Sequence, residues 1–303
     1  MDKSCTVVYW KPSTINALEP SLAISIIASI MHVLFWIQVL SFSSLRQQNL
    51  IWLYEYIVFN GLLLVRFFLL YGIRRGETCL FPTATNIICY FEASSKAYIN
   101  TIQNYFLLAF TMSRYLRIVC NQNIYKEKIR VIILLHFLIY TMSGLNIIVQ
   151  FLTGWTDIWR TPGRSCDILY ESVMIQIFNL FIMYVIPVIM NIIILALGII
   201  HVSSTYGIRS EQIISIRHRR QRKLLWQTIS FYSVWFILWS PNTLVFQFTD
   251  DTSTFAIYTS LLCYLEIALD PLIIAIIDLR FLMSWRKIWK KIHRQQRRIG
   301  TIS

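Results

Sequence analysis

Residues 173–202 read VMIQIFNLFIMYVIPVIMNIIILALGIIHV and contain no Asp, Glu, Lys or Arg. A helix needs about 20 mostly apolar residues to cross the hydrocarbon core of a bilayer, so this stretch predicts a membrane-spanning helix. The rest of the chain has a similar bias. Of its 303 residues, 56% are hydrophobic and 14% are charged, whereas about 25% of the residues in a soluble domain are charged. We therefore expect an integral membrane protein.

Apolar runs of similar length recur along the chain and predict an all-α fold, a bundle of seven transmembrane helices. The expected spans are Ser21–Phe42, Leu50–Tyr71, Asn86–Cys120, Val131–Phe151, Val173–Val202, Lys223–Phe248 and Thr254–Ile277. This division leaves residues 1–20 as an extracellular N-terminus, 21–277 as the bundle and 278–303 as a cytoplasmic tail. Residues 1–20 contain no apolar core typical of a signal peptide, so the first span is expected to direct the chain to the membrane.

Lys and Arg are distributed unevenly among the segments that connect the spans. The net charge is +13, and the excess lies after the third and fifth spans and in the tail, whereas the other connecting segments are close to neutral. Positive charge collects on the cytoplasmic side of membrane proteins, which predicts an outer N-terminus and an inner tail, with the plasma membrane as the expected location. Nucleic-acid binding is not favoured, because each basic stretch borders an apolar span.

The tail predicts an amphipathic helix on the inner membrane surface, with lipid as a partner. Apolar residues recur there at spacings of three and four, with Lys and Arg between them, at Phe281, Leu282, Trp285, Ile288, Trp289 and Ile292. Basic residues between the apolar ones would face anionic headgroups, and tryptophan suits the membrane interface. The alternative is a soluble amphipathic helix packed on a partner.

Three short motifs lie in or at the ends of the expected spans. They are Ser113-Arg114-Tyr115 in the third, Trp239-Ser240-Pro241 in the sixth and Asp270-Pro271-Leu272-Ile273-Ile274 in the seventh. Together they resemble the acid-Arg-Tyr, Cys-Trp-x-Pro and Asn-Pro-x-x-Tyr motifs of rhodopsin-like (class A) G protein-coupled receptors, and the resemblance covers nearly the whole chain. The chain departs from this pattern because Ser113 replaces the acid, Asp270 the Asn and Ile274 the Tyr.

This resemblance implies a receptor that converts the binding of an extracellular ligand into activation of a heterotrimeric G protein. It implies an activation switch formed by Trp239, Pro241, Asp270 and Pro271. It also implies contacts with the G protein at Arg114, Tyr115, Arg219, Arg220, Arg222 and Lys223. Because Ser113 cannot restrain the neighbouring Arg as an acid does, we hypothesise that basal signalling is elevated.

The resemblance further implies a disulfide between Cys89 and Cys166 that closes an outer loop over the ligand cavity, while a Cys5–Cys79 bond is left open. The implied ligand residues are Glu92, Lys96, Asn100, Asn242, Thr243, Phe246, Ser260 and Tyr264. Lys96 would repel a ligand amine, so an anionic, peptide or neutral ligand is expected, and a peptide is the first choice. Lys96 could also pair with Glu92 at the i, i+4 spacing, or with Glu266.

Asn60, Gln103 and Asp270 align with the positions that form the family's sodium pocket, although the family usually has an Asp where this chain has Asn60. One carboxylate and two amides could hold a sodium ion, since hard cations prefer oxygen ligands. The alternative is a polar cluster that locks the helices by hydrogen bonds. No other cofactor is expected.

Three other functions are considered. A transporter or channel would need a polar path, often with internal repeats, and the sequence contains no repeat. An enzyme would need a catalytic or metal-binding motif, but the five His residues are scattered without metal-binding spacing. The third is a receptor-like scaffold that no longer couples, which the altered motifs keep open.

Overall fold

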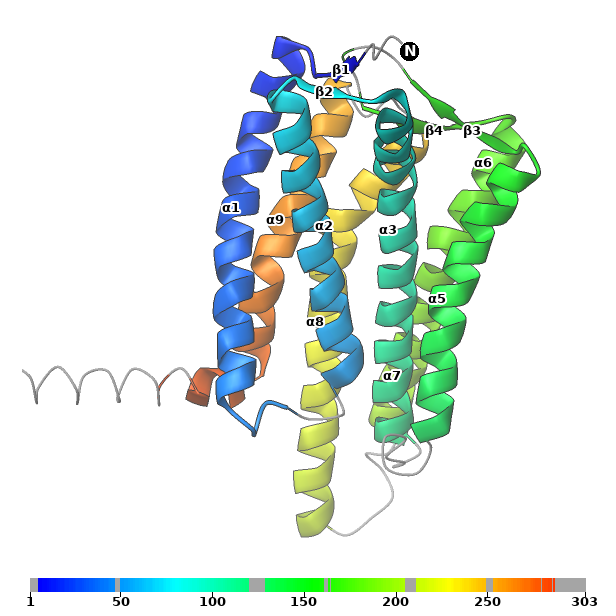
Figure 1. Cartoon of the computed structure of the whole chain (residues 1–303). Helices are drawn as coiled ribbons and strands as arrows, with labels where there is room; N and C mark the ends of the chain where they lie inside the picture. The colour runs from blue at the N-terminus through cyan, green and yellow to red at the C-terminus, as the bar shows by residue number, and fades with distance from the viewer. Residues whose placement is uncertain are drawn as a thin grey trace, which may run out of the picture.

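The computed structural model describes residues 5–46, 50–119, 129–160, 163, 165–204, 211–248, 253–278, 280–284 and 286, without some of the side chains in these ranges. Its main elements are long helices that run side by side (Figure 1). They are α1 (Pro12–Ser41), α2 (Ile51–Arg75), α3 (Pro82–Val119), α5 (Ile129–Leu152), α6 (Val173–Leu180), the π-helical turn η2 (Phe181–Val185), α7 (Ile186–Ser204), α8 (Glu211–Phe248) and α9 (Thr254–Ile277).

Five membrane-spanning candidates occur within the described part of the chain, judged by length and apolar composition. They are α1, α2, α5, the continuous segment Val173–Ser204 and Phe255–Ile276 of α9. The other two long helices are more polar. α3 carries buried amides and charges such as Gln103 and Glu92, and α8 begins with a basic stretch that includes Arg219 and Arg222. The chain is therefore a multi-pass helical membrane protein.

Two small antiparallel sheets lie at one end of the bundle, here termed the strand end (Figure 1). β1 (Thr6–Val8) pairs with β2 (Thr78–Leu80), and β3 (Thr156–Trp159) pairs with β4 (Asp167–Tyr170). The segment before the first expected span is thus partly ordered, and α1 begins at Pro12 rather than Ser21. Proline suits the first turn of a helix, where its missing N–H is not needed.

α3 packs against α2, α5, α7 and α8 and forms the centre of the bundle. Large buried side chains fill the space around it, among them Phe106, Trp235 and Trp239. The Trp235 and Trp239 rings stack with their centroids 5.3 Å apart. This packing places the apolar core between the helices, while other apolar side chains face outward, such as Met142 (62% exposed), as expected of helices in lipid.

The segment after α9 folds back onto α1. Phe281 is fully buried and stacks on Phe35 with a 5.3 Å centroid separation, and the Gln38 side chain donates a 2.7 Å hydrogen bond to the Phe281 carbonyl oxygen. The tail pattern had predicted a lipid-facing position for Phe281, and this prediction is wrong, because Phe281 belongs to the bundle core. Trp285 and residues 287–303, the rest of that expected surface helix, lie outside the described residues.

Amide side chains join α5 to α6. Gln150 Nε2 donates to Asn179 Oδ1 over 2.5 Å, and Asn179 Nδ2 donates to Gln150 Oε1 over 2.7 Å. Asn146 Nδ2 lies 3.3 Å from the same Asn179 oxygen. Asn179 is fully buried and Gln150 nearly so. Because a buried amide without a partner is costly, these reciprocal bonds fix how the two helices face each other.

We predict that Asn179→Ala lowers the free energy of unfolding by about 1–2 kcal/mol, the upper range for interhelical hydrogen bonds in membranes. The reason is that Gln150 would lose both of its Asn179 bonds. Thermal unfolding of the purified protein in detergent measures the change. Met174→Ala, at a position of α6 that is 76% exposed, serves as the control. Equal unfolding midpoints for the two variants would contradict the prediction.

Candidate functional site

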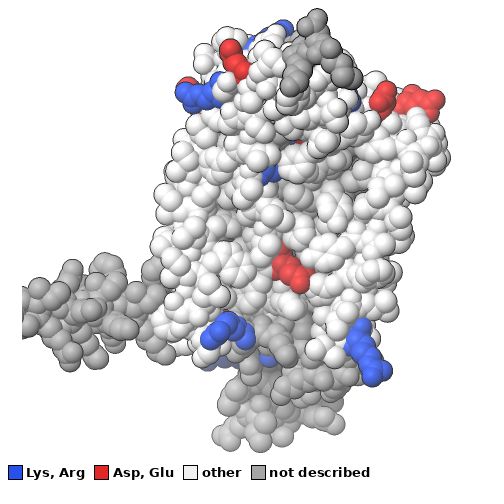
Figure 2. Space-filling view, in the orientation of Figure 1, with Lys and Arg blue, Asp and Glu red and all other residues white. Residues whose placement is uncertain are grey.

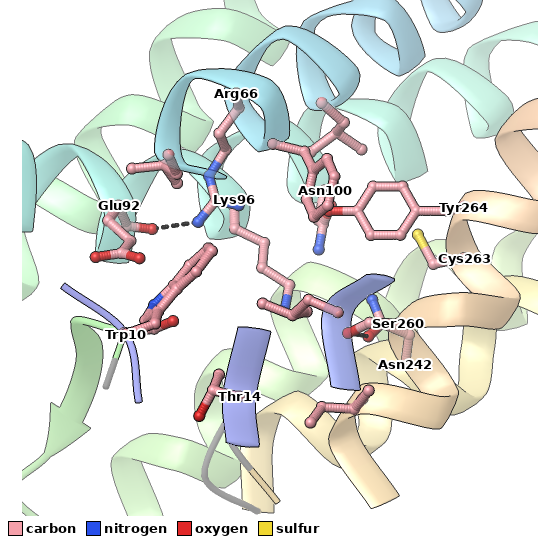
Figure 3. Close-up of a pocket in the computed structure, with 16 residues that line it drawn as sticks. Trp10, Thr14, Arg66, Glu92, Lys96, Asn100, Asn242, Ser260, Cys263 and Tyr264 are labelled. Atoms are coloured by element: carbon pink, nitrogen blue, oxygen red, sulfur yellow. Dashed lines mark hydrogen bonds between the residues drawn. The ribbon is translucent and has the colours of Figure 1, made fainter. Parts of the chain in front are cut away.

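A cavity of about 80 Å³ lies at the strand end of the bundle (Figure 3). It is lined by α1, α2, α3, α8 and α9, together with the segment before α1 and one residue of the loop between β3 and β4. The lining residues are Trp10, Thr14, Leu18, Leu63, Arg66, Phe67, Leu70, Glu92, Lys96, Asn100, Ser165, Asn242, Ile257, Ser260, Cys263 and Tyr264.

Most of the expected ligand residues meet in this cavity. Those that line it are Glu92, Lys96, Asn100, Asn242, Ser260 and Tyr264. Thr243 is buried but does not line it, which corrects the expectation. Asn242 Oδ1 accepts a 3.1 Å hydrogen bond from Ser260 Oγ, so Asn242 faces α9, and the next residue of a helix points about 100° away. The side chain of Phe246 lies outside the described part of the chain.

Sequence reasoning missed the contributions of α2 and of the N-terminal segment. Arg66 lies on α2 in the middle of an apolar run, and a charge in such a run is itself a sign of function or pairing. That signal was available but was not used. Trp10 and Thr14 carry no comparable signal, because they reach the cavity only when the chain before α1 folds over the bundle.

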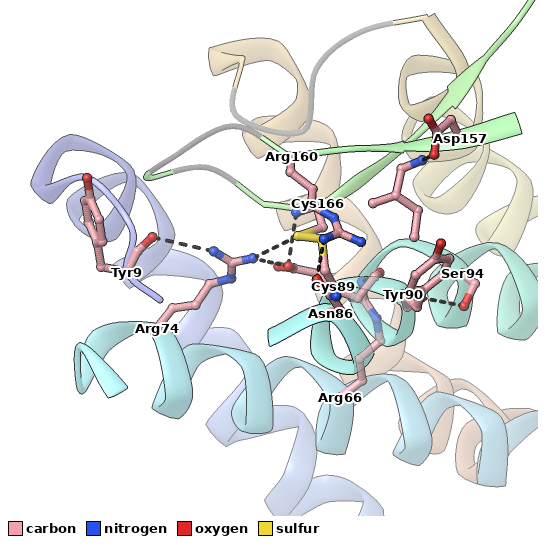
Figure 4. Close-up of a disulfide and its surroundings, with 12 residues drawn as sticks. Tyr9, Arg66, Arg74, Asn86, Cys89, Tyr90, Ser94, Asp157, Arg160 and Cys166 are labelled. Carbon is pink, nitrogen blue, oxygen red and sulfur yellow. Dashed lines mark hydrogen bonds and ion pairs between the residues drawn. A yellow bond between two sulfur atoms is a disulfide. The ribbon is translucent and has the colours of Figure 1, made fainter. Parts of the chain in front are cut away.

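A buried ion pair lies beside this cavity. The Arg74 guanidinium pairs with the Glu92 carboxylate, and their side chains are 4% and 3% exposed. The same carboxylate oxygen accepts a 3.0 Å hydrogen bond from the Cys166 backbone N–H, and the Trp10 ring lies 5.6 Å from the guanidinium carbon. Glu92 is thus held by Arg74 from α2, and Figure 4 shows Arg74 beside the Cys89–Cys166 bond.

Two disulfides tie the strand end together. Cys89 of α3 is bonded to Cys166, which follows β3, as the family resemblance implied, with the two Cα atoms 5.3 Å apart. Cys5 is bonded to Cys79 of β2 across 5.5 Å between Cα atoms, which answers the pairing that the sequence left open. The first bond holds the β3–β4 hairpin against α3, and the second holds the N-terminal segment near the cavity.

Asn60, Gln103 and Asp270 lie together in the bundle, as expected. Asn60 Nδ2 donates to Asp270 Oδ2 over 2.6 Å, and Gln103 Nε2 donates to Asn60 Oδ1 over 2.5 Å. Two nearby residues extend the cluster, since the Tyr56 hydroxyl donates to Glu266 Oε1 over 2.5 Å. All five side chains are buried. The hydrogen-bonded cluster expected as one alternative is therefore present.

Two oxygens in this cluster have no donor. Gln103 Oε1 and Glu266 Oε2 are buried and accept no hydrogen bond from the described residues. Oxygen atoms without donors, next to the Asp270 carboxylate, are the ligand type that a sodium ion takes. The residues present therefore fit sodium as well as a hydrogen-bonded cluster. No group of three or more His, Cys, Asp or Glu residues with metal-binding geometry occurs in the described ranges.

The expected switch residues lie in α8 and α9, and one of them, Asp270, is part of this cluster. Trp239 is fully buried in α8, and its ring stacks on Trp235. Pro241 and Pro271 lie inside α8 and α9, where a proline removes a backbone hydrogen bond and allows a bend. Asp270, immediately before Pro271, joins the second bend to the buried cluster. A shift in α8 or α9 would therefore move the packing around Trp239.

At the opposite end, Arg114 of α3 lines a cavity of about 30 Å³ together with Asp278. Burial acts to raise the pKa of the Asp278 carboxyl, but hydrogen bonds from Arg280 and the positive charges of Arg280 and Arg114 outweigh it and lower that pKa. The Asp278 carboxylate, which follows α9, therefore lies near Arg114. Ser113, the residue before Arg114, replaces the acid that the family motif has there. Arg114 also lies over the Phe110 ring, with its guanidinium carbon 5.0 Å from the centroid.

The same ends of α3 and α8 are joined by a neutral bond. Gln221 Nε2 donates to the Ile118 carbonyl oxygen over 2.8 Å. A Cβ atom added at Gly198 of α7 would meet Leu225 at 3.1 Å and Tyr115 at 3.9 Å, so glycine allows the three helices to approach closely. Among the expected G protein contacts, Arg219, Arg222 and Lys223 are exposed, Tyr115 is half-buried, and the side chain of Arg220 is not described.

A helical membrane bundle with a covered cavity at one end and a partly buried Arg at the other has the architecture of a transmembrane receptor. A family model described as "7 transmembrane receptor (rhodopsin family)" matches residues 59–274. The chain belongs to this family, which confirms the resemblance found in its motifs. Members of this family are generally receptors and not enzymes. No curated protein matches the chain.

We predict that Arg74→Met lowers the free energy of unfolding by about 3–5 kcal/mol, because it leaves the buried Glu92 carboxylate without its cation. Thermal unfolding of the purified protein and the amount of receptor at the cell surface both measure this loss. Arg75→Met is the matched control, since Arg75 is the next residue of α2 and is exposed. Indistinguishable unfolding curves for the two variants would show that the pair does not hold the strand end.

Proposed function

We propose that this protein binds an extracellular ligand at the strand end and activates a heterotrimeric G protein at the opposite end. The observation that carries the proposal is the placement of both sites in one helical bundle. α3 contributes Lys96 to the cavity and Arg114 to the opposite end. α8 contributes Asn242 and the basic stretch that contains Arg222. A movement of these two helices would therefore couple the two ends.

The chain crosses the plasma membrane seven times, with α3 and α8 as the remaining spans. Both run alongside the five apolar helices (Figure 1), and the visible face of the bundle has a nearly uncharged band between charged ends (Figure 2). α3 buries its amides and charges inside the bundle. The N-terminus is outside, because Lys and Arg collect toward the opposite end and both disulfides lie at the strand end, where an oxidising exterior would maintain them.

The ligand is a peptide that contacts Lys96, Asn100, Asn242, Ser260 and Tyr264. These residues line the cavity under a hairpin and an N-terminal segment that are each held by a disulfide. Ligand binding shifts an existing equilibrium between a closed and an open bundle. Trp239, packed between the two ends, is the pivot of this change, and Pro241 and Pro271 provide the bends.

The buried cluster of Asn60, Gln103 and Asp270 stabilises the closed bundle by its hydrogen bonds. A sodium ion is the alternative occupant. Asp270 together with the unbonded oxygens of Gln103 and Glu266 would hold it. In either form, the cluster links α2, α3 and α9, and the bundle must rearrange it to open.

Asp278 and Gln221 restrain the G protein site in place of the missing acid at Ser113. Asp278 supplies a negative charge beside Arg114, and Gln221 holds α8 to α3. This restraint weakens the argument for elevated basal signalling that the sequence alone suggested, because a different carboxylate supports the closed state.

We predict that Asp278→Asn raises ligand-independent signalling by roughly fivefold, the lower end of typical allosteric coupling energies. The measurement is G protein activation in cells, normalised to the amount of receptor at the surface. Glu171→Gln, at an exposed residue of the strand end, is the control and should leave the level unchanged. A basal level in Asp278→Asn equal to that of the unmodified receptor would count against the restraint.

The proposed function itself is tested by a ligand screen, with peptides first, in cells that express promiscuous G proteins. We predict that Arg114→Ala abolishes the response to any active peptide while binding of that peptide persists, because the change affects only the transducer end. Lys96→Ala should instead weaken binding. Retained signalling by Arg114→Ala at normal surface expression would refute the proposed coupling. The topology has a separate test, because antibody access to epitopes on both termini in intact cells would refute it.

A further inference from the structure

We propose that the cavity at the strand end binds a carboxylate, and that Arg66 of α2 is the residue that holds it. The assignment deepens the proposed receptor function, and rests on it, by naming the chemical group that the ligand presents. It involves a residue that neither the motifs nor the alignment with the family indicated.

Arg66 enters the cavity from α2 with two of its N–H groups already bonded. Its Nε donates to Ser95 Oγ over 2.8 Å. Its Nη2 donates to the backbone carbonyl oxygen of Glu92 over 2.5 Å, the bond drawn in Figure 3. Both acceptors are neutral. Among the described residues, Arg66 forms no ion pair with a carboxylate. A guanidinium has five N–H donors, so three remain for another acceptor.

These two bonds hold the guanidinium in place. Ser95 and Glu92 both belong to α3, so the Arg66 side chain bridges α2 and α3 and is fixed at its Nε and at one Nη. A fixed, planar guanidinium binds a carboxylate through two parallel hydrogen bonds. Because the side chain is already ordered, a ligand would lose less conformational entropy on binding it.

Among the residues that line the cavity, no acid is available to balance the charge of Arg66. Glu92 is the one acidic residue among those that line the cavity. Its carboxylate is already paired with Arg74 and bonded to the Cys166 N–H. Arg66 therefore keeps a full positive charge in a half-buried position, where a counter-ion is worth more than in water. The Lys96 side chain extends into the same cavity (Figure 3) and adds positive charge there.

The cavity wall beside Arg66 is apolar. Leu63, Phe67 and Leu70 of α2 line it, and the Phe67 ring packs against Tyr264 of α9 with a 4.9 Å centroid separation. The structure therefore favours a carboxylate attached to a small apolar or aromatic group. A free small acid and the C-terminus of a peptide both present this chemistry.

Benzoate and benzamide test this inference, because they differ mainly in charge. The apparent Kd of each is measured from its effect on the thermal unfolding of the purified full-length receptor. We expect benzoate, but not benzamide, to raise the unfolding midpoint. We expect Arg66→Gln to weaken benzoate binding by at least about tenfold, because the variant lacks the charged donor of the hydrogen bonds to the carboxylate. Equal stabilisation by benzoate and benzamide would overturn the proposal.

Arg75→Gln is the matched control, because Arg75 lies on the same helix, does not line the cavity and bonds the Tyr71 hydroxyl instead. It should bind benzoate as the unmodified receptor does. Arg66→Lys, which keeps the charge but loses the planar donors, should bind with intermediate affinity and carries the test if Arg66→Gln does not fold. Unchanged benzoate affinity in the Arg66 variants, or an equal loss of affinity in Arg75→Gln, would show that Arg66 is not the residue that holds the carboxylate.

Two further arms separate the sources of the carboxylate and separate this proposal from the receptor function. Hippurate, which resembles a peptide C-terminus, is compared with benzoate in the binding assay, and peptides with free or amidated C-termini are compared in the signalling assay. Tighter binding of hippurate together with a response only to free C-termini supports a peptide carboxylate, and tighter binding of benzoate supports a small acid.

Equal responses to free and amidated peptides would refute the carboxylate site but not the receptor function. Binding of benzoate without any signalling would refute the receptor function but not the carboxylate site.

Discussion

The structure depends on one constraint, which is that polar groups inside a helical membrane bundle have only each other as partners. Lipid cannot satisfy them, and an unsatisfied polar group in hydrocarbon is costly. Polar side chains that bond across helices therefore help to determine which helices lie next to each other. Asn60 joins α2 to α3 through Gln103 and to α9 through Asp270. Gln150 and Asn179 join α5 to α6 in the same way.

This constraint also explains the character of α3. It is less apolar than its neighbours because it lies at the centre and supplies partners to several of them. Ser95 accepts a bond from α2, Gln103 donates to α2, and Asn104 donates to the backbone of η2 over 2.6 Å. α3 is therefore too polar to be recognised as a membrane span from its length and apolar composition alone. The same helix contributes Lys96 to the cavity and Arg114 to the opposite end.

The two ends of the bundle are closed in different ways. At the strand end, covalent bonds and a buried ion pair hold the hairpin and the N-terminal segment in place. At the opposite end, no disulfide occurs among the described residues, and the polar contacts of α3 there include a neutral hydrogen bond from Gln221 and the charge of Asp278 beside Arg114. These restraints are weaker than covalent bonds, which fits the proposal that this end opens for a G protein. The asymmetry follows from the residues at each end and fits the proposed orientation, in which the covalently closed strand end faces outward.

The sequence by itself determined the all-helical membrane class, the approximate spans and the family, because apolar length and proline-containing motifs are local features that a linear reading can recognise. It also indicated which cysteine would bond Cys89 and that Asn60, Gln103 and Asp270 would meet, since the family resemblance supplied the alignment. Only the tertiary structure decided the partners that come from distant segments. Arg74, which follows the expected span Leu50–Tyr71, is buried against Glu92, Thr243 does not line the cavity, and Phe281 enters the core. The physical reason is that periodicity shows which residues share a helix face, whereas the rotation of each helix and the path of the chain before α1 depend on packing against neighbours that are remote in sequence.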